Sequence, residues 1–310
     1  GLKSKVKTQT ISLIKGKTAT DIINSHTILT RNDFSSILDT DTTGTMYQAE
    51  DDDGTTYYFA GSVDDNWVKF AGIYWRIVRV NGDGSIRLIY SGTTSTTIGT
   101  NTQIGTSVFN EKSDSREYVG YMYTIGQDHG LEKDSAIKGV LDSWYDNNLK
   151  SYENKISEEA GFCGDREPAN ENNTGYYLYA GSERLINHTP TFKCSNSADL
   201  YTVSGSSKGN KALSNPIGLI TADEVVYAGG VQGISNNRFY LYTGQIYWTM
   251  TPDKYPEAWV FAVYMTGAAT DINVDHSLGI RPVINLKADT QFKIDGNGTS
   301  TNPYVVIGAE

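Results

Sequence analysis

The histidines and carboxylates of this sequence are the residues that could bind a metal or perform acid–base chemistry. Its four histidines lie far apart, and none falls in HExxH, the spacing that places two imidazoles on one helix face. His276 has Asp271 and Asp275 close by in the sequence, and the three could form a metal site. A polar loop that satisfies its own backbone is the simpler interpretation, so we predict no metal and no cofactor.

The known sequence motifs of nucleotide binding do not occur in the chain. The P-loop and GxGxxG are both missing. Glu158 and Glu159 are adjacent and would point apart, whereas a glycosidase needs two carboxyl groups that converge from separate elements. The run Asp51–Asp53 lacks the spacing and the distal Glu of a calcium loop and indicates a solvated turn. We therefore expect a noncatalytic protein, with an extracellular hydrolase as the less favoured alternative.

Aromatic and polar side chains gather between residues 244 and 276. Tyr and Trp offer rigid contact area with one polar end, and Asn and Asp add hydrogen bonds. We predict that the 253–278 segment binds a glycan or protein ligand. The candidate contact residues are Tyr247, Tyr255, Trp259, Tyr264, Asp271, Asn273, Asp275 and His276. Trp248 is expected in the core, and the alternation of Trp259 with Phe261 leaves a core position open for Trp259 too.

The two cysteines, Cys163 and Cys194, lie in a long polar region that needs an internal link. Two thiols cannot form a four-ligand zinc site alone, and no CxxC is present. We predict a disulfide, which would contribute ~3 kcal/mol and imply an oxidising compartment. The alternative is a pair of unlinked, buried thiols.

Residues 70–90, FAGIYWRIVRVNGDGSIRLIY, combine aromatics with three arginines and raise the question of nucleic-acid binding. The NGDG sequence predicts a tight hairpin turn at residues 81–84. The expected cross-strand pairs are Trp75–Tyr90, Ile77–Leu88 and Arg79–Ile86 on one face, and Arg76–Ile89 and Val78–Arg87 on the other. Aromatics and arginines thus separate, whereas a nucleic-acid surface presents them together, and the net charge of −10 opposes phosphate binding. We predict a scaffold ribbon, no nucleic-acid partner, and arginines that pair with carboxylates.

Three helices are predicted from capping and periodicity. KTATDIINS forms a short one, and residues 134–152 form the clearest, with Asp134 or Ser135 as N-cap. Its inward face is expected to carry Ile137, Val140, Leu141 and Trp144. A third follows the T-x-x-E capping box of Thr221 and Glu224 and ends at two glycines. Strand-like runs occupy residues 56–60, 67–90, 239–250, 258–265 and 279–287, and a short strand closes the tail.

The length of 310 residues fits one large domain or two smaller ones. We divide the chain into an N-terminal helical or linker segment (1–46), an α+β domain (47–290) and a C-terminal strand or module junction (291–310). No stretch approaches the ~20 apolar residues of a membrane span, so we predict no membrane insertion. The opening GLKSKVKTQT has no Met or signal peptide and is typical of a mature or truncated ectodomain.

Four stretches resemble a family of uncharacterised secreted or surface proteins of Gram-positive, gut-type bacteria: WVKFAGIYWRIVRVNGDGSIRLIYSGT, GLITADEVVYAGG, YWTMTP and GIRPVINLK. The C-terminal half also resembles C-type-lectin-like modules related to formylglycine-generating enzymes and to the variable receptor-binding proteins of diversity-generating retroelements. In those modules one strand ends in W-L-R-S-P and a closing strand carries G-x-R-P. Trp248 and Pro252 match the ends of the first pattern, and Gly279, Arg281 and Pro282 match the second.

The resemblance implies a C-type-lectin-like α+β fold with mainly antiparallel sheets, a few short helices and long loops that carry the ligand contacts. It implies no enzyme activity, because the catalytic cysteines of the formylglycine enzyme have no counterpart. We therefore expect a noncatalytic binding or adhesion protein, extracellular or attached to the cell surface. The alternative is a structural pilus or cell-wall subunit, since the tail GNGTSTNPYVV is similar to junctions between modules of bacterial surface proteins.

Overall fold

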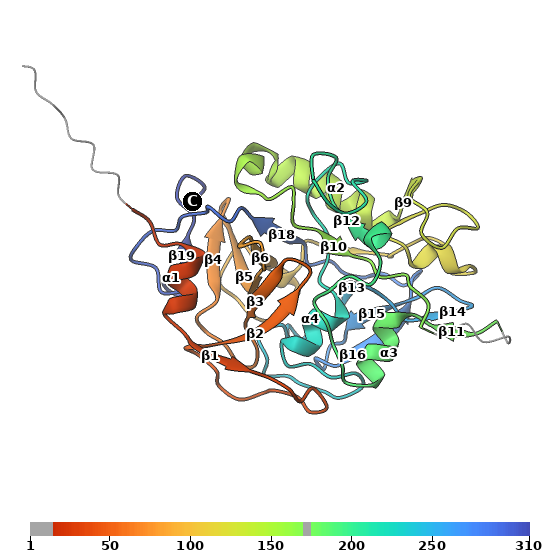
Figure 1. Cartoon of the computed structure of the whole chain (residues 1–310), viewed down its shortest axis with the longest axis horizontal. Coiled ribbons are helices and arrows are strands. Elements are labelled where there is room, and N and C mark those ends of the chain that lie inside the picture. Colours follow the sequence, from red (N-terminus) through yellow and green to blue (C-terminus); the bar gives the residue numbers. More distant parts are fainter. Residues whose placement is uncertain (1–14, 170–174) are drawn as a thin grey trace, which may run out of the picture.

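The computed structural model describes residues 15–169 and 175–310. Its fold is mixed α+β, with mainly antiparallel sheets and a few short helices, as predicted. Two sheets form the body, one from the N-terminal third (orange in Figure 1) and one from the C-terminal third (blue). Residues 1–14 of the expected N-terminal segment lie outside the described residues.

The larger sheet has eight strands. Six follow the order β1-β2-β3-β5-β4-β19, while β6 also pairs with β5, and β18 pairs with β6. Their bounds are β1 Thr27–Thr30, β2 Thr45–Asp51, β3 Gly54–Tyr58, β4 Trp67–Phe70, β5 Ile73–Val80, β6 Ile86–Gly92, β18 Val283–Leu286 and β19 Tyr304–Val305. Strands from both ends of the chain therefore complete this sheet.

The smaller sheet has five strands in the order β16-β15-β13-β17-β7. They are β7 Thr106–Ser107, β13 Tyr247–Pro252, β15 Trp259–Val263, β16 Ala269–Asn273 and β17 Leu278–Gly279. Three further pairs stand apart: β8 Met122–Tyr123 with β9 Lys133–Asp134, β10 Phe162–Cys163 with β12 Leu200–Tyr201, and β11 Tyr177–Leu178 with β14 Lys254–Tyr255. The strand predicted over residues 239–250 begins only at Tyr247, so it is shorter than predicted.

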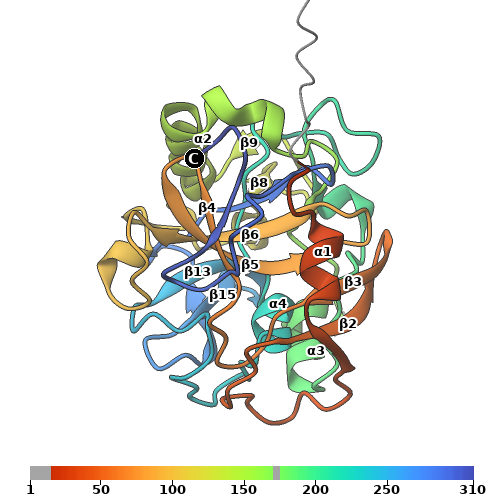
Figure 2. The same cartoon turned by 90° about the vertical axis from the view of Figure 1, so that its left-hand side faces the viewer.

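Helices lie against the sheets and between them. The α-helices are α1 Ala19–Asn24, α2 Ala136–Asn148, α3 Ala180–Ile186 and α4 Ala222–Tyr227. The 3-10 helices are η1 Thr100–Thr102, η2 Arg116–Val119, η3 Lys150–Lys155 and η4 Ser197–Asp199. Figures 1 and 2 both show α4 close to both sheets. One connected set of buried apolar side chains runs from Ala19 to Ala309 and includes residues of both sheets.

The three predicted helices form, and the two N-caps that we predicted are present. Ser135 caps α2, and the Thr221–Glu224 capping box opens α4. The predicted inward face of α2 is wrong at Val140, whose side chain is exposed. Lys138 is buried instead, where its ammonium pairs with Asp134 and Asp142 one turn away on either side.

The G-x-R-P stretch carries the chain from one sheet to the other. Gly279 ends β17 in the smaller sheet, and β18 of the larger sheet begins three residues after Ile280. A Cβ at Gly279 would lie 2.0 Å from the Gln103 side-chain oxygen, so a larger residue would clash there. The buried Arg281 donates hydrogen bonds to two carbonyls. One belongs to Tyr90 in β6 of the larger sheet, and the other to Leu241 in the segment before β13 of the smaller sheet. This motif is therefore a structural joint of the fold.

The ribbon of β5 and β6 follows the predicted register only in part. Trp75, Arg76 and Ile77 face Tyr90, Ile89 and Leu88 as predicted. A β-bulge at Val78 then shifts the register, so that Arg79 faces Arg87 and Val80 faces Ile86. The predicted pairs Val78–Arg87 and Arg79–Ile86 are therefore wrong. The Val78 carbonyl accepts from the Phe59 amide, which extends the β3–β5 pairing on the other side of the strand.

Both faces of this ribbon are covered, and Arg76 and Arg87 are each 2% exposed. The predicted carboxylate partners exist for Arg79 and Arg87, both of which pair with Glu224. Arg76 instead bonds the Asn66 side-chain oxygen and lies over the Trp67 ring. The ribbon is scaffold, as expected, but one arginine is held by neutral groups.

Candidate functional site

The predicted binding segment, residues 253–278, does not form one continuous surface. Its central part joins residues from two strand pairs into one surface, which we call the Tyr255 surface. Its partly exposed members are Lys254, Tyr255, Trp259, Asp271 and Asn273, and the buried Tyr177 supports it. The β11–β14 ladder sets Tyr177 opposite Tyr255, and the β15–β16 ladder sets Trp259 opposite Asn273. Short paired strands therefore fix the backbone under most of these side chains.

Aromatic rings and one ion pair make up the Tyr255 surface. The rings of Tyr177 and Tyr255 are stacked with centroids 5.1 Å apart, and the Lys254 ammonium lies 4.4 Å from the centre of the Trp259 ring. The same ammonium pairs with the Asp271 carboxylate. Lys254 and Asp271 are about one-quarter exposed, so solvent and a ligand can both reach the pair.

Asp253 lies directly beneath this surface and is buried. One of its oxygens accepts a 2.6 Å hydrogen bond from Ser182, and the other is 3.4 Å from the Lys254 ammonium. Burial raises the pKa of Asp253 to about 6, and the nearby Asp271 carboxylate also raises it.

Four predicted contact residues lie elsewhere. Tyr247 is buried in β13, where its hydroxyl donates to the Leu241 carbonyl, so it is wrong as a surface contact. Tyr264 is exposed at the turn between β15 and β16. Asp275 and His276 are exposed together in the turn before β17 and contact each other. Trp248 is buried in the core, as predicted.

The candidate metal site around His276 does not assemble. Asp271 pairs with Lys254 in β16, while His276 and Asp275 lie in the following turn. Within the described ranges, 15–169 and 175–310, no group of three or more His, Cys, Asp or Glu side chains could hold a metal ion.

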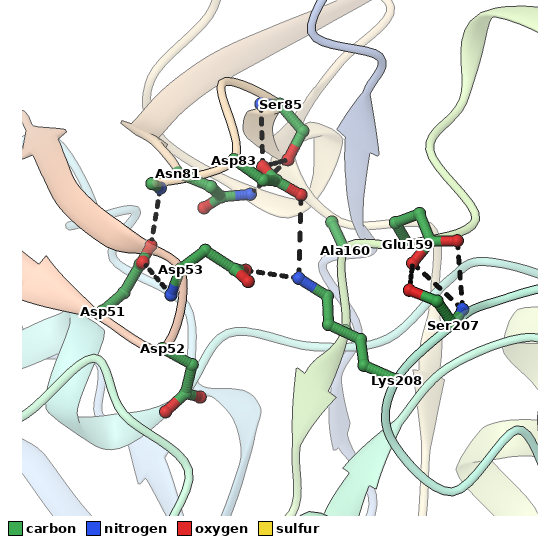
Figure 3. A network of polar contacts seen from close by, with 12 residues as sticks. Asp51, Asp52, Asp53, Asn81, Asp83, Ser85, Glu159, Ala160, Ser207 and Lys208 are labelled. Carbon is green, nitrogen blue, oxygen red and sulfur yellow. Dashed lines mark hydrogen bonds and ion pairs between the residues drawn. The ribbon is translucent and has the colours of Figure 1, made fainter.

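A second site, which we call the charged cleft, lies beside α4 and the disulfide. Buried residues form its inner part: Arg79, Arg87, Asp165, Arg184, Asp223 and Glu224. More exposed residues form its mouth: Asp52, Asp53, Lys193 and Lys208. Figure 3 shows part of this mouth, where Asp53 reaches Lys208 while Asp51 and Asp52 point in other directions. Its interior volume is about 60 Å³.

Ion pairs occupy the inner part of the charged cleft. Arg79 and Arg87 both contact Glu224, at 3.2 and 2.5 Å, and Arg79 also bonds Asp51 at 2.7 Å. Burial alone would raise the pKa of Glu224, but the two guanidinium groups lower it below its ordinary value. Arg184 binds Asp165 at 2.6 Å and Asp223 at 2.8 Å in the same way.

The predicted disulfide is present and forms one wall of the charged cleft. Cys163 and Cys194 are bonded, with their Cα atoms 5.6 Å apart. The amide of Cys194 also donates to the Asp52 carboxylate, which ties the disulfide loop to the β2–β3 turn. The Asp51–Asp53 run, expected to be a solvated turn, thus has one buried member and contributes to a cleft.

No local pattern in the sequence indicates the charged cleft as a site. Its carboxylates come from positions 51–53, 165 and 223–224, and no local spacing connects them. The predictions that arginines pair with carboxylates and that Cys163 bonds Cys194 were the two relevant hints. These two predictions gave the kinds of interaction correctly but did not show that the residues would meet in one cleft.

Comparison with protein-family models, with curated proteins and with solved structures gave no match to this chain. No helix in the described part of the chain is long and apolar enough to cross a membrane.

Proposed function

We propose that this protein is a noncatalytic extracellular or cell-surface protein that binds glycans through the Tyr255 surface. The Tyr255 ring carries the proposal. It is partly exposed and stacks on the buried Tyr177 ring, and a rigid aromatic face of this kind suits the apolar face of a sugar ring. Asp271, Asn273 and Lys254 supply hydrogen-bonding groups at its edge. The disulfide is consistent with an oxidising, extracellular environment. A C-type-lectin-like relationship, proposed from the sequence patterns around Trp248 and Arg281, fits the same function.

A glycan array tests the proposal, with the double variant Tyr255→Ala plus Asp271→Ala as the critical comparison. We expect the wild-type chain to bind a restricted set of glycans and the variant to lose at least tenfold in affinity, since stacking and a carboxylate bond are lost together. Tyr264→Ala plus Asp275→Ala is the matched control, because both residues are exposed but lie outside the Tyr255 surface. Equal binding by both double variants would contradict the assignment of the site.

The two alternatives have less support. A structural subunit that joins other copies through its tail needs a free tail strand, whereas β19 pairs with β4 of its own chain. A hydrolase needs two carboxyl groups that face one reaction centre in different protonation states. The carboxylate pairs Asp165–Asp223 and Asp51–Glu224 of the charged cleft each share one arginine, which is typical of structural ion pairs.

A further inference from the structure

We propose that the Tyr255 surface binds uncharged glycans and rejects glycans that carry carboxylate or sulfate groups. This selectivity rests on the proposed glycan binding and concerns the chemical class of the ligand at the same surface. Glu257, at the rim of the surface, is the residue to which we assign the largest part of the rejection. The charge balance, the hydrogen-bonding groups and the position of Glu257 each support this selectivity.

Lys254, the lysine of the Tyr255 surface, already serves two carboxylates. Its ammonium lies 3.4 Å from Asp253 and also pairs with Asp271. Burial raises the pKa of Asp253 to about 6, so this carboxyl is mostly ionised at neutral pH. Two negative charges therefore surround one positive charge, and an anionic ligand would have to displace a carboxylate from Lys254.

A second cation, Arg116, lies close to the Tyr177 hydroxyl beneath the surface. Its guanidinium group is paired with the Asp128 carboxylate at 2.7 Å, and both side chains are about one-third exposed. The segment of residues 111–117, which includes Arg116 and accepts a hydrogen bond from the Ala258 amide, contains three acidic and two basic residues. Neither this pair nor its segment adds net positive charge to the Tyr255 surface.

The hydrogen-bonding groups at the edge of the surface suit hydroxyls. Asp271 and Asn273 are two residues apart on β16, so their side chains project from the same face of the strand. The Asp271 carboxylate can only accept hydrogen bonds, while the Asn273 amide group can donate, since its oxygen accepts from the Asp275 amide at 3.4 Å. A sugar hydroxyl can donate to the first and accept from the second. A carboxylate or sulfate can only accept, so it would bring Asp271 no donor and would add repulsion.

Glu257 adds a further negative charge at the rim of the surface. The residue is exposed and lies two positions after Tyr255 and two positions before Trp259. Its Cα therefore lies within ~7 Å of theirs, which is less than one Debye length at physiological ionic strength. Among the residues that the structure describes, its carboxylate has no hydrogen-bond or ion-pair partner. The Ala258 amide donates to the Ser113 carbonyl at 2.8 Å, and this bond holds the backbone beside Glu257 in place.

A glycan array that prints neutral glycans beside their acidic counterparts tests the selectivity. The matched pairs are lactose-terminated chains with and without sialic acid, galacturonan oligomers with free or methyl-esterified carboxyls, and galactose chains with and without sulfate. We expect the neutral member of each bound pair to bind at least ~10-fold more tightly, since each unit charge ~7 Å away weakens the binding of an anion roughly threefold at low salt. The acidic member should gain affinity as NaCl is raised, because salt screens the repulsion.

Glu257→Lys is the critical variant, because it reverses one charge at the rim. It should move the preference towards the acidic member by ~10-fold at low salt, and Glu257→Gln should move it roughly threefold. Because Glu257 is exposed, both variants should fold. Asp289→Lys is the matched control: it makes the same charge change at an exposed position after β18 of the larger sheet and should leave the preference unchanged.

Acidic glycans that bind as tightly as their neutral counterparts, or more tightly, would overturn the selectivity but leave glycan binding intact. A preference that Glu257→Lys does not move, or that Asp289→Lys moves equally, would overturn the role of Glu257. Binding of no glycan at all, or binding that Tyr255→Ala plus Asp271→Ala does not weaken, would contradict the proposed function and the selectivity with it.

Discussion

Glu224 and Asp253 are both buried carboxyl groups, one beside each sheet, and their surroundings differ. Glu224 receives two guanidinium groups and the Thr221 amide, and its pKa is lowered. Asp253 receives a hydroxyl and a lysine that also serves Asp271, and its pKa is raised. Both side chains are almost completely buried, at 2% and 3% exposed, and the carboxyl with two guanidinium partners is the one whose pKa is lowered.

The largest effect is expected from Glu224→Gln. This variant leaves Arg87 buried without a carboxylate, and breaking a buried pair in this way typically costs 3–5 kcal/mol. We expect a loss of about 3–5 kcal/mol in the free energy of unfolding, measured by urea denaturation at neutral pH. Glu132→Gln, at an exposed position, should change it by less than ~0.5 kcal/mol. A loss under ~1 kcal/mol for Glu224→Gln would show that the ion pairs contribute little.

The second-largest effect is expected from removal of the disulfide, which lines the charged cleft together with Glu224. Replacing both cysteines with alanine should lower the free energy of unfolding by ~2–4 kcal/mol. Alkylation without reductant should leave the intact mass of the wild-type protein unchanged, and two added groups would refute the bond. Glycan binding at the Tyr255 surface should survive in the folded variant, because hydrogen-bonded ladders hold that surface.

Asp253 should produce a pH dependence opposite to that of Glu224. Because its folded pKa of about 6 exceeds the ordinary 3.8, its contribution to stability is complete below pH 3.8 and is lost as pH rises through 6. Glu224 contributes above its unfolded pKa and loses that contribution as pH falls. Between pH 4 and 7 we expect Asp253→Asn to remove a decline of ~1–3 kcal/mol, measured as the difference between the two stability–pH curves. Parallel curves for variant and wild type would contradict the assignment.

The smallest effect is expected from the Lys254–Asp271 pair. Both side chains are about one-quarter exposed, and such pairs contribute ~0–1 kcal/mol. A double-mutant cycle with Lys254→Ala and Asp271→Ala should give a coupling energy in that range that shrinks in high salt. A coupling above ~2 kcal/mol would mean that Asp271 binds Lys254 as strongly as Glu224 binds Arg87.

Local signals in the sequence predicted the elements well. Ser135 and the Thr221–Glu224 box located two helix starts, because a cap depends on residues three apart. Trp75 faces Tyr90 as predicted, although the pairs next to the turn are shifted by one residue and the bulge at Val78 lies between them and this pair. The bulge at Val78 was not predicted, because the alternation of residues and the turn sequence predict one continuous register.

The candidate sites were less predictable for the same reason. Tyr255, Trp259 and Asp271, which were predicted as contact residues, lie near one another, but their neighbour Tyr177 comes from a segment about 80 positions earlier. Tyr247 was misjudged because composition does not distinguish a buried tyrosine from an exposed one. Asp165 and Asp52 have no local feature that predicts their convergence on the charged cleft.

The way the larger sheet is completed constrains the order in which this chain can fold. β6 and β4 flank β5, and their outer partners are β18 and β19, drawn from the last 30 residues. A growing or translocating chain that has not yet released residue 283 therefore exposes two unpaired strand edges. Such edges are templates for aggregation, and long-range pairing is slow to form. Folding that is completed once these final strands are available suits this topology better than folding from the N-terminus onward.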